Sequence, residues 1–332
     1  MTIRNRQWVL ASRPDGRVAE SNFALNEIDV PPLQDGQVLV KVEYLSLDPY
    51  MRGRMEDAKS YAAPQPLHAV MIGGTVGEVV DSTHSKYRPG DGVVGIGGWQ
   101  EYFVSDGTGL RKIDTHRIPA SLYLGVVGMP GVTAWYGLHR IGKARAGETV
   151  AVSAASGAVG SVVGQLAKIH GCRAVGFAGG RAKCDYVVGE LGFDACIDYK
   201  AEGARDAFAA ATPSGVDIVF ENVGGAVFDM ALARMNPFGR VALCGLIAGY
   251  NAEDIALHNV RSILVNRLTV KGFIVSEHQD VWGQALEELG GQVASGRLKY
   301  RESISAGTES APAAFIGLLQ GKNFGKQLVK MF

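Results

Sequence analysis

The segment from Thr149 to Gly160 reads TVAVSAASGAVG. It starts as a short apolar strand, passes through small residues and leads into a helical pattern that extends from Ala158 to His170. A glycine turn after a strand and before a helix is typical of nucleotide-binding proteins. Gly157 lets the backbone approach a pyrophosphate, and the helix N-terminus offers free amides. We predict that this turn binds phosphate through Ser156, Gly157, Ala158 and Val159, although small residues also suit plain packing of a helix on a sheet.

Short apolar strands and amphipathic helices alternate in the segments that follow this turn. The predicted strands occupy residues 149–154, 174–177, 216–220, 240–244 and 268–275, and the predicted helices occupy 158–170, 183–191 and 226–235. Repeated strand–helix units form a parallel sheet with helices on both faces. We therefore predict an α/β fold with a doubly wound Rossmann sheet.

The first third of the chain has a different pattern, irregular and rich in strands. Residues 38–45, 75–80 and 92–95 are the clearest strand candidates there. A chain of 332 residues is longer than one hydrophobic core usually fills, so we expect two domains. The last thirty residues differ again, and we expect them to return to the first domain.

Composition limits the classes of function. The formal net charge is zero, which argues against binding to nucleic acid or to an anionic membrane. The sequence has no uncharged apolar run of about 18 residues, and its N-terminus lacks the apolar segment of a signal peptide. The four cysteines form no CxxC pair, so a reduced, cytoplasmic protein is the expectation.

The end of the second predicted Rossmann strand indicates which dinucleotide binds. Residues 178–183 read AGGRAK. An acidic residue here would accept hydrogen bonds from the ribose 2′-hydroxyl of NAD. Instead Arg181 and Lys183 follow Gly180, and two cations suit the 2′-phosphate of NADP. The alternative is that both cations are solvated residues of the first helical turn. We favour NADP(H).

The chain resembles the medium-chain dehydrogenase/reductase superfamily, and within it the zinc-free branch of prostaglandin, 2-alkenal and bacterial curcumin reductases. The resemblance covers essentially the whole chain. The segments that carry it are residues 45–55 (LSLDPYMRGRM), 128–134 (GMPGVTA), 154–160, 221–225 (ENVGG), 244–245, 250–251 and 321–326 (GKNFGK).

The resemblance implies a GroES-like catalytic domain over residues 1–124, completed by residues 300–332. A Rossmann NADP(H)-binding domain would occupy residues 125–299, with the active site in the cleft between the two. It also makes a homodimer plausible, through an edge strand near Leu268-Thr269-Val270. The sequence itself does not show a dimer.

The same resemblance implies further coenzyme contacts. Lys183 and Tyr199 would hold the 2′-phosphate side of adenosine, and Asn323 would reach the coenzyme from the C-terminal tail. The nicotinamide half would pass Asn222 and Gly224, which follow the fourth strand, and the Cys244-Gly245 pair. Thr133 is a further candidate, although the adjacent Pro130-Gly131 equally serves to start a helix.

The sequence predicts no catalytic metal. Zinc-dependent relatives have a cysteine near the place of Ser46 and a His-Glu pair near Gly73 and Gly74. This chain offers serine and glycines there, and its seven histidines are scattered along the sequence without ligand spacing.

These features predict NADPH-dependent reduction of the carbon–carbon double bond of an α,β-unsaturated ketone or aldehyde. Hydride transfer to the β-carbon places negative charge on the carbonyl oxygen, so the site needs a hydrogen-bond donor there. Tyr50, in a Pro-flanked turn, is the first candidate and Tyr250 the second. Two alternatives remain open: a quinone reductase of the same superfamily, and an NADPH-binding protein without turnover.

Overall fold

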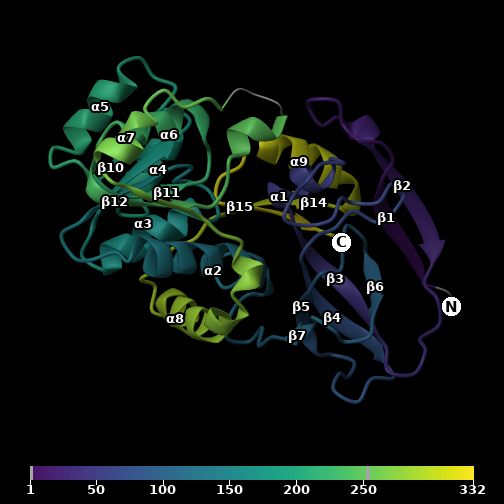
Figure 1. Cartoon of the computed structure of the whole chain (residues 1–332). Helices are drawn as coiled ribbons and strands as arrows, with labels where there is room; N and C mark the ends of the chain where they lie inside the picture. Colours follow the sequence, from purple (N-terminus) through teal and green to yellow (C-terminus); the bar gives the residue numbers. More distant parts are fainter. Residues whose placement is uncertain (1–2, 252–254) are drawn as a thin grey trace. The chain divides into compact units, whose positions relative to one another are not determined.

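The structure is a computed structural model that describes residues 3–251 and 255–332. The chain divides into two compact units (Figure 1). Unit 1 comprises residues 1–124 and 302–332, and unit 2 comprises residues 125–301. None of the helices in the described residues is long and apolar enough to cross a membrane.

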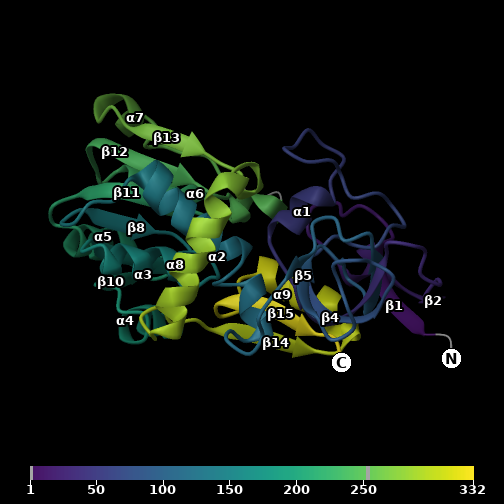
Figure 2. The same ribbon diagram turned by 90° about the horizontal axis from the view of Figure 1, so that it is seen from below.

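Unit 2 is built on one parallel sheet. Its strands are β8 (Thr149–Val152), β9 (Arg173–Ala178), β10 (Ala195–Asp198), β11 (Val216–Glu221), β12 (Met235–Leu243) and β13 (Thr269–Gly272). Their order across the sheet is β10-β9-β8-β11-β12-β13, and all neighbours are parallel. This is the strand order of a dinucleotide-binding Rossmann sheet, so the predicted fold class is confirmed. Figure 2 shows β12 and β13 at one edge of it.

Helices cover both faces of this sheet, with α3 on one side and α5 and α6 on the other (Figure 1). The helical segments of unit 2 are α2 (Met129–Tyr136), the π-helical η3 (Gly137–Gly142), α3 (Gly160–Ile169), α4 (Arg181–Gly189), α5 (Ala204–Ala211), α6 (Gly225–Leu232), η4 (Ile247–Asn251), α7 (Arg261–Val265), η5 (Val275–Glu277), η6 (Gln279–Val281) and α8 (Trp282–Ala294). The sequence did not predict α5 or α8. Buried aromatic and branched side chains, among them Phe177, Phe208 and Val219, fill the space between sheet and helices.

Two glycines set how closely α3 approaches the sheet. A Cβ added at Gly160 would lie 2.3 Å from the carbonyl oxygen of Ala154, and one at Gly164 would lie 1.8 Å from Phe193 Cζ. Neither position has room for a side chain. The glycines therefore bring the N-terminus of α3 close to the end of β8.

Unit 1 is mainly antiparallel. Its strands are β1 (Arg4–Leu10), β2 (Phe23–Asp29), β3 (Val38–Ser46), β4 (Thr75–Ser82), β5 (Gly92–Gly95), β6 (Tyr102–Ser105), β7 (Arg111–Lys112), β14 (Glu302–Ala306) and β15 (Lys326–Lys330). β1 and β2 form a hairpin, and the larger sheet has the order β14-β15-β3-β4-β5-β7, with β6 also paired to β3. The helical segments are η1 (Glu20–Asn22), α1 (Tyr50–Arg54), η2 (Ala120–Leu124), η7 (Thr308–Ser310) and α9 (Ala311–Leu319).

The C-terminal segment is an integral part of unit 1. β15 pairs with β3 in the centre of the larger sheet, and Phe315 of α9 is fully buried against Phe23 and Trp99. The core of the first 124 residues is therefore completed by the last thirty.

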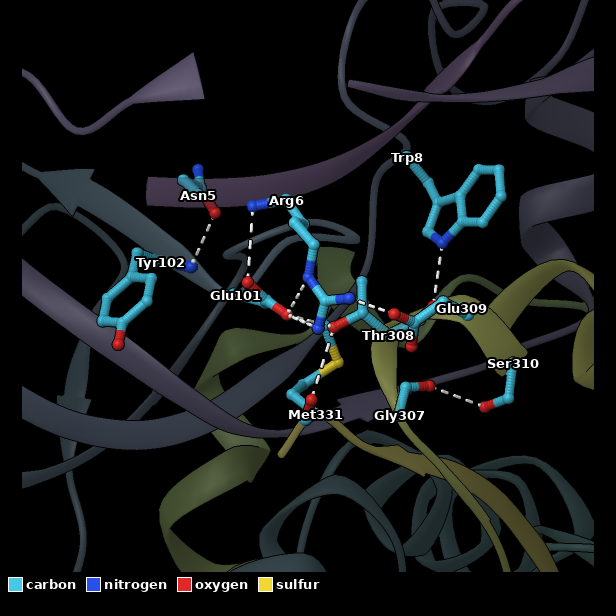
Figure 3. Close-up of polar contacts among 10 residues, drawn as sticks. All are labelled: Asn5, Arg6, Trp8, Glu101, Tyr102, Gly307, Thr308, Glu309, Ser310 and Met331. Atoms are coloured by element: carbon cyan, nitrogen blue, oxygen red, sulfur yellow. Dashed lines mark hydrogen bonds and ion pairs between the residues drawn. The ribbon is translucent and has the colours of Figure 1, made fainter. Parts of the chain in front are cut away.

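A polar network holds the C-terminal segment against the N-terminal strands of unit 1 (Figure 3). Arg6 Nε donates to Glu101 Oε1 at 2.8 Å, and its guanidinium also pairs with Glu309. Thr308, fully buried, donates from Oγ1 to the same Glu101 oxygen at 2.8 Å. Trp8 Nε1 donates to the carbonyl oxygen of Thr308 at 2.8 Å. The buried carboxylate of Glu101 thus joins both ends of the chain.

We expect Thr308→Val to lower the free energy of unfolding by about 1–3 kcal/mol, because the nearly isosteric side chain removes a donor from a buried carboxylate. Chemical denaturation of the full chain measures the loss. Ser310→Ala is the matched control, since that hydroxyl donates only to the nearby Gly307 carbonyl oxygen. Equal stability of the Thr308→Val variant and the parent chain would contradict this reading of the network.

Candidate functional site

The predicted phosphate-binding turn lies at the carboxyl end of β8. Ala154 has a positive φ of 49°, and the Gly157 N–H donates to the Ala154 carbonyl oxygen at 2.9 Å, which closes a tight turn. Ser156 is buried inside it. The Ser161 N–H already donates to the carbonyl oxygen of Gly157, and α3 begins at Gly160. The arrangement fits an anion at the helix N-terminus.

A cationic pocket lies where β9 and β10 end. A Cβ added at Gly179 would lie 3.0 Å from the Tyr199 hydroxyl oxygen and 3.2 Å from Lys200 Cε, so these side chains cover the backbone of the Gly179-Gly180 pair. Gly180 has a φ of 100° and an open space where a Cβ would stand. The Gly180 N–H donates to Asp198 Oδ1 at 2.9 Å, which fixes the turn before α4.

Lys183 is close to Lys200 in this pocket. Burial, and then the charge of Lys200, lower the pKa of Lys183. Two ammonium groups near each other repel unless an anion binds between them, and a phosphate ester is such an anion. The Arg181 side chain, in contrast, is 92% exposed, and its Nε lies 3.7 Å from Asp185 Oδ2. The structure thus gathers Lys183, Tyr199 and Lys200, whereas Arg181 extends into solvent.

The end of β11 carries the next group of predicted residues. Asn222 Nδ2 donates to the Ser153 carbonyl oxygen at 2.8 Å, and the Asn222 N–H donates to Ser153 Oγ at 2.7 Å. These bonds tie the end of β11 to the end of β8. Gly224 has a φ of 82°, which favours glycine, and its N–H donates to Glu221 Oε1 at 2.6 Å.

Glu221 is fully buried beneath this turn. Its Oε1 accepts the N–H groups of Val223 and Gly224, and burial raises the pKa of its carboxyl to about 7. Burial also raises the pKa of the Cys244 thiol to about 12, with the charge of Glu221 adding to the effect. Cys244 is therefore a thiol at neutral pH, suited to packing and not to nucleophilic attack.

Tyr250 lies beside the same turn, within η4. A Cβ added at Gly245 would stand 3.4 Å from the Asn222 carbonyl oxygen and 3.6 Å from the Tyr250 hydroxyl oxygen. Gly245 therefore leaves room between the end of β11 and this phenol. Residues 252–254, which follow η4, lie outside the described part of the chain.

Two further predicted residues make local hydrogen bonds. Thr133 is buried in α2 and donates from Oγ1 to the Met129 carbonyl oxygen at 2.7 Å. Asn323, in unit 1, donates from Nδ2 to the Gly325 carbonyl oxygen at 2.8 Å. In both residues the side-chain oxygen can still accept a hydrogen bond, which is compatible with a coenzyme contact. Such a contact stays a prediction for either residue.

Tyr50 is the first residue of α1 in unit 1 and packs against the hydrophobic core of that unit. Burial, reinforced by the neighbouring Asp48, raises the pKa of its phenol well above the usual range. The hydroxyl therefore stays protonated at every physiological pH and can serve as a hydrogen-bond donor.

A buried ionic network lies next to Tyr50 in the sequence. The Lys326 ammonium donates to Asp48 Oδ1 at 2.6 Å and to the Leu47 carbonyl oxygen at 2.8 Å, and only 3% of Lys326 is exposed. Ser46 donates from Oγ to the other oxygen of Asp48. Burial lowers the pKa of Lys326, which Asp48 opposes. The network holds residues 46–48 against β15.

This network does not fit a catalytic zinc. Ser46 Oγ is engaged with Asp48, and Gly74, whose carbonyl oxygen accepts the Ser46 N–H, has no side chain to offer. A divalent cation beside the buried Lys326 ammonium would be repelled. These residues therefore do not support a metal-dependent step in this part of unit 1.

The structure brings two of the scattered histidines together, which their spacing in the sequence did not indicate. Ligand atoms of His139, His170 and Glu288, all in unit 2, lie within 4.8 Å of one another. The three residues are far apart in the sequence, and helix packing brings them together.

Sequence reasoning also missed two cations. Lys200 follows Tyr199 directly, and its position beside a predicted phosphate contact was an available signal. Lys326 gave no such signal, because its partner Asp48 lies 278 residues away.

Comparisons with known proteins agree with this arrangement. A family model described as the N-terminal domain of oxidoreductase matches residues 6–113, and one described as zinc-binding dehydrogenase matches residues 158–290. The NADPH-dependent curcumin reductase of Escherichia coli (strain K12) is 46% identical over 338 residues, covering 99% of this chain and 97% of that protein. Prostaglandin reductase 1 of Rattus norvegicus is 41% identical over 335 residues, covering 99% of each.

A solved structure is similar over the same length. The crystal structure of CurA in complex with NADPH from Vibrio vulnificus has a TM-score of 0.94 and 45% sequence identity, and it covers 98% of this chain and 99% of that one. The likeness extends through both units.

The cationic pocket predicts coenzyme preference. We expect Lys183→Ala to raise KM for NADPH about 10- to 100-fold with little change for NADH, because a charge-assisted hydrogen bond is worth about 1.5–3 kcal/mol. Initial rates with each coenzyme measure the split. Arg181→Ala, on the exposed face of α4, is the matched control. An equal rise in KM for both coenzymes would show that Lys183 does not recognise the 2′-phosphate.

Proposed function

The chain belongs to the medium-chain dehydrogenase/reductase family, in its zinc-free branch, and from this we propose that it is an NADPH-dependent reductase of α,β-unsaturated ketones or aldehydes. The reduction saturates the carbon–carbon double bond. The observation that carries the proposal is the 46% identity, over nearly the whole chain, to an NADPH-dependent curcumin reductase.

The two units have separate tasks in this proposal. Unit 2 is the NADP(H)-binding domain, and unit 1 is the GroES-like catalytic domain, completed by the C-terminal residues. The amides around Ser156, Gly157, Ala158 and Val159 bind the pyrophosphate. Lys183, Lys200 and Tyr199 bind the 2′-phosphate beside the open backbone of Gly180. This division is supported by the parallel sheet of unit 2 and by its cationic pocket.

Residues at the ends of β11 and β12 hold the nicotinamide half. Asn222 is fixed by Ser153, Gly224 is fixed by Glu221, and Gly245 leaves an open approach beside them. Cys244 contributes an apolar, protonated thiol. Thr133 and Asn323 complete the set of coenzyme contacts in the proposal.

The reaction requires a donor for the charge that develops on the substrate. Bound NADPH supplies a hydride for the β-carbon. Tyr50 donates a hydrogen bond to the carbonyl oxygen as negative charge gathers there, and Tyr250 is the second donor. Water supplies the proton for the α-carbon. The high pKa of Tyr50 suits this task, since the phenol donates without ionising.

The Lys326–Asp48 pair serves to position Tyr50. The ammonium and Ser46 both engage the Asp48 carboxylate, which neutralises it and fixes the turn that leads into α1. A rigid turn keeps the Tyr50 phenol in one position. This matters because a hydrogen-bond donor that stabilises developing charge works best when it does not have to reorganise during the reaction.

A panel of conjugated carbonyls tests the function. We expect oxidation of NADPH with a simple enone or alkenal, with the saturated carbonyl compound as product, at a rate well above background and above the rate with NADH. Tyr50→Phe should lower kcat about 100- to 1,000-fold, because one oxyanion donor is lost. Dissociation constants for NADPH should stay nearly unchanged.

The same assay includes the competing outcomes. A quinone that is reduced while enones are not would identify a quinone reductase, and binding of NADPH without turnover on any acceptor would identify a non-catalytic protein. Full turnover by the Tyr50→Phe variant would leave the reaction in place and remove Tyr50 from it. Tyr102→Phe, at a phenol on β6 of the same unit whose ring packs against Phe332, is the control.

We also propose a cytoplasmic homodimer. The four cysteines are free thiols in the described structure, which suits a reducing compartment. The edge strand β13 is exposed along its whole length, and the α7 residue Leu264 is 79% exposed. An exposed strand edge flanked by apolar side chains favours pairing with a second copy.

Substitution on this edge tests the dimer. We expect Val270→Asp combined with Leu264→Asp to convert a dimer into a monomer, because two buried carboxylates would face each other across the two-fold axis. Analytical ultracentrifugation measures the mass. Ile304→Asp, at an exposed apolar residue of unit 1, is the control. A parent chain that sediments as a monomer would refute the proposal.

A further inference from the structure

Three helical segments of unit 2 bring two imidazoles and a carboxylate together. His139 lies in η3, His170 is the residue that ends α3, and Glu288 lies in α8. One ligand atom from each lies within 4.8 Å of the others, and all three side chains are half-buried. The ring centroids of His139 and His170 are 4.5 Å apart. We call these three residues the His–His–Glu cluster.

His170 is held in one tautomer. Its Nδ1 is 2.8 Å from the carbonyl oxygen of Leu166, and a carbonyl oxygen can only accept. Nδ1 therefore carries a proton, and Nε2 is the ring nitrogen that remains for a ligand bond. A backbone carbonyl that orients an imidazole through its other nitrogen is the usual second contact of a histidine that binds a metal.

His139 offers a buried ring nitrogen to the cluster. Its Nε2 is buried and has no hydrogen-bond partner among the described residues. A buried nitrogen with an unsatisfied lone pair or proton costs free energy, which a metal ligand bond would recover.

Glu288 supplies the negative charge. Trp135 Nε1 donates to its Oε2 at 2.7 Å, which fixes the carboxylate. Arg140, a cationic neighbour, donates to Gln284 of α8, and its guanidinium lies 5.3 Å from the Trp135 ring centroid. Two imidazoles and one carboxylate are a ligand set that zinc accepts.

We propose that the His–His–Glu cluster is a zinc-binding site, with water as the fourth ligand. Zinc bonds of about 2.0–2.1 Å place tetrahedral ligand atoms about 3.4 Å apart. The three ligand atoms, within 4.8 Å of one another, must approach to that distance when the ion binds. The site lies among helices of unit 2 and takes no part in the reduction. It ties η3, α3 and α8 together, and its effect is on stability.

Titration with the metal tests the site. Full-length protein is treated with a chelator, dialysed and titrated with ZnCl₂ by isothermal calorimetry, and with CoCl₂ by visible absorption. We expect one ion per chain and the intense cobalt bands of a four-coordinate site. At a zinc concentration of one hundred times Kd, the Tm should rise by roughly 5–10 °C. Turnover with an enone should be the same before and after chelation.

Variants assign the ligands. His170→Ala and Glu288→Gln should each weaken zinc binding at least tenfold, and Glu288→Gln keeps an oxygen that can accept from Trp135. Glu287→Gln, at the exposed neighbour on the same helix, is the matched control and should bind zinc as the parent does. Thermal unfolding without metal verifies that each variant is folded. Absence of saturable binding, or equal binding by the Glu288→Gln and Glu287→Gln variants, would overturn the proposal.

Discussion

All strands of the unit 2 sheet run in the same direction, and this constraint places most of the residues that we propose as coenzyme contacts. β8, β9, β10, β11 and β12 end at one edge, and the loops that leave them carry the glycine turn, the Gly179-Gly180 pair, Lys200, Asn222 and Gly245. Hydrogen bonds between the side chain of one residue and the backbone of the other join Ser153, after β8, to Asn222, after β11, and tie the two strand ends together. The chemistry of the site follows from this alignment more than from any single side chain.

Unit 1 depends on a different interaction, a buried ion pair between its two chain segments. The Lys326 ammonium of β15 and the Ser46 hydroxyl both donate to the Asp48 carboxylate, which leads into α1. A buried ion pair costs desolvation free energy, which its hydrogen bonds offset only when the geometry is good. The second hydrogen bond of the ammonium, to the Leu47 carbonyl oxygen, adds to that compensation.

The sequence predicted features that depend on neighbouring residues and missed those that depend on packing. The glycine turn and the alternation of strands and helices are local, and both could be read directly. α8 was missed because Gly283, Gly290 and Gly291 weaken its helical pattern. Lys326 with Asp48, and the His–His–Glu cluster, join residues from distant segments, so their contacts appear only after the sheet and helices are assembled. The separate roles of Tyr50 and Tyr250 stay predictions.

The return of the C-terminal segment to the first unit has a consequence for biosynthesis. β15, which pairs with β3, is synthesised after the whole of unit 2. Domains generally fold as units during synthesis, N-terminal first, but here unit 1 stays incomplete until residues 302–332 follow unit 2. Unit 2 is continuous in sequence, has all its strands earlier and can therefore fold first. A nascent chain stalled near residue 300 would carry a folded nucleotide-binding unit, while the larger sheet of unit 1 would still lack β14 and β15.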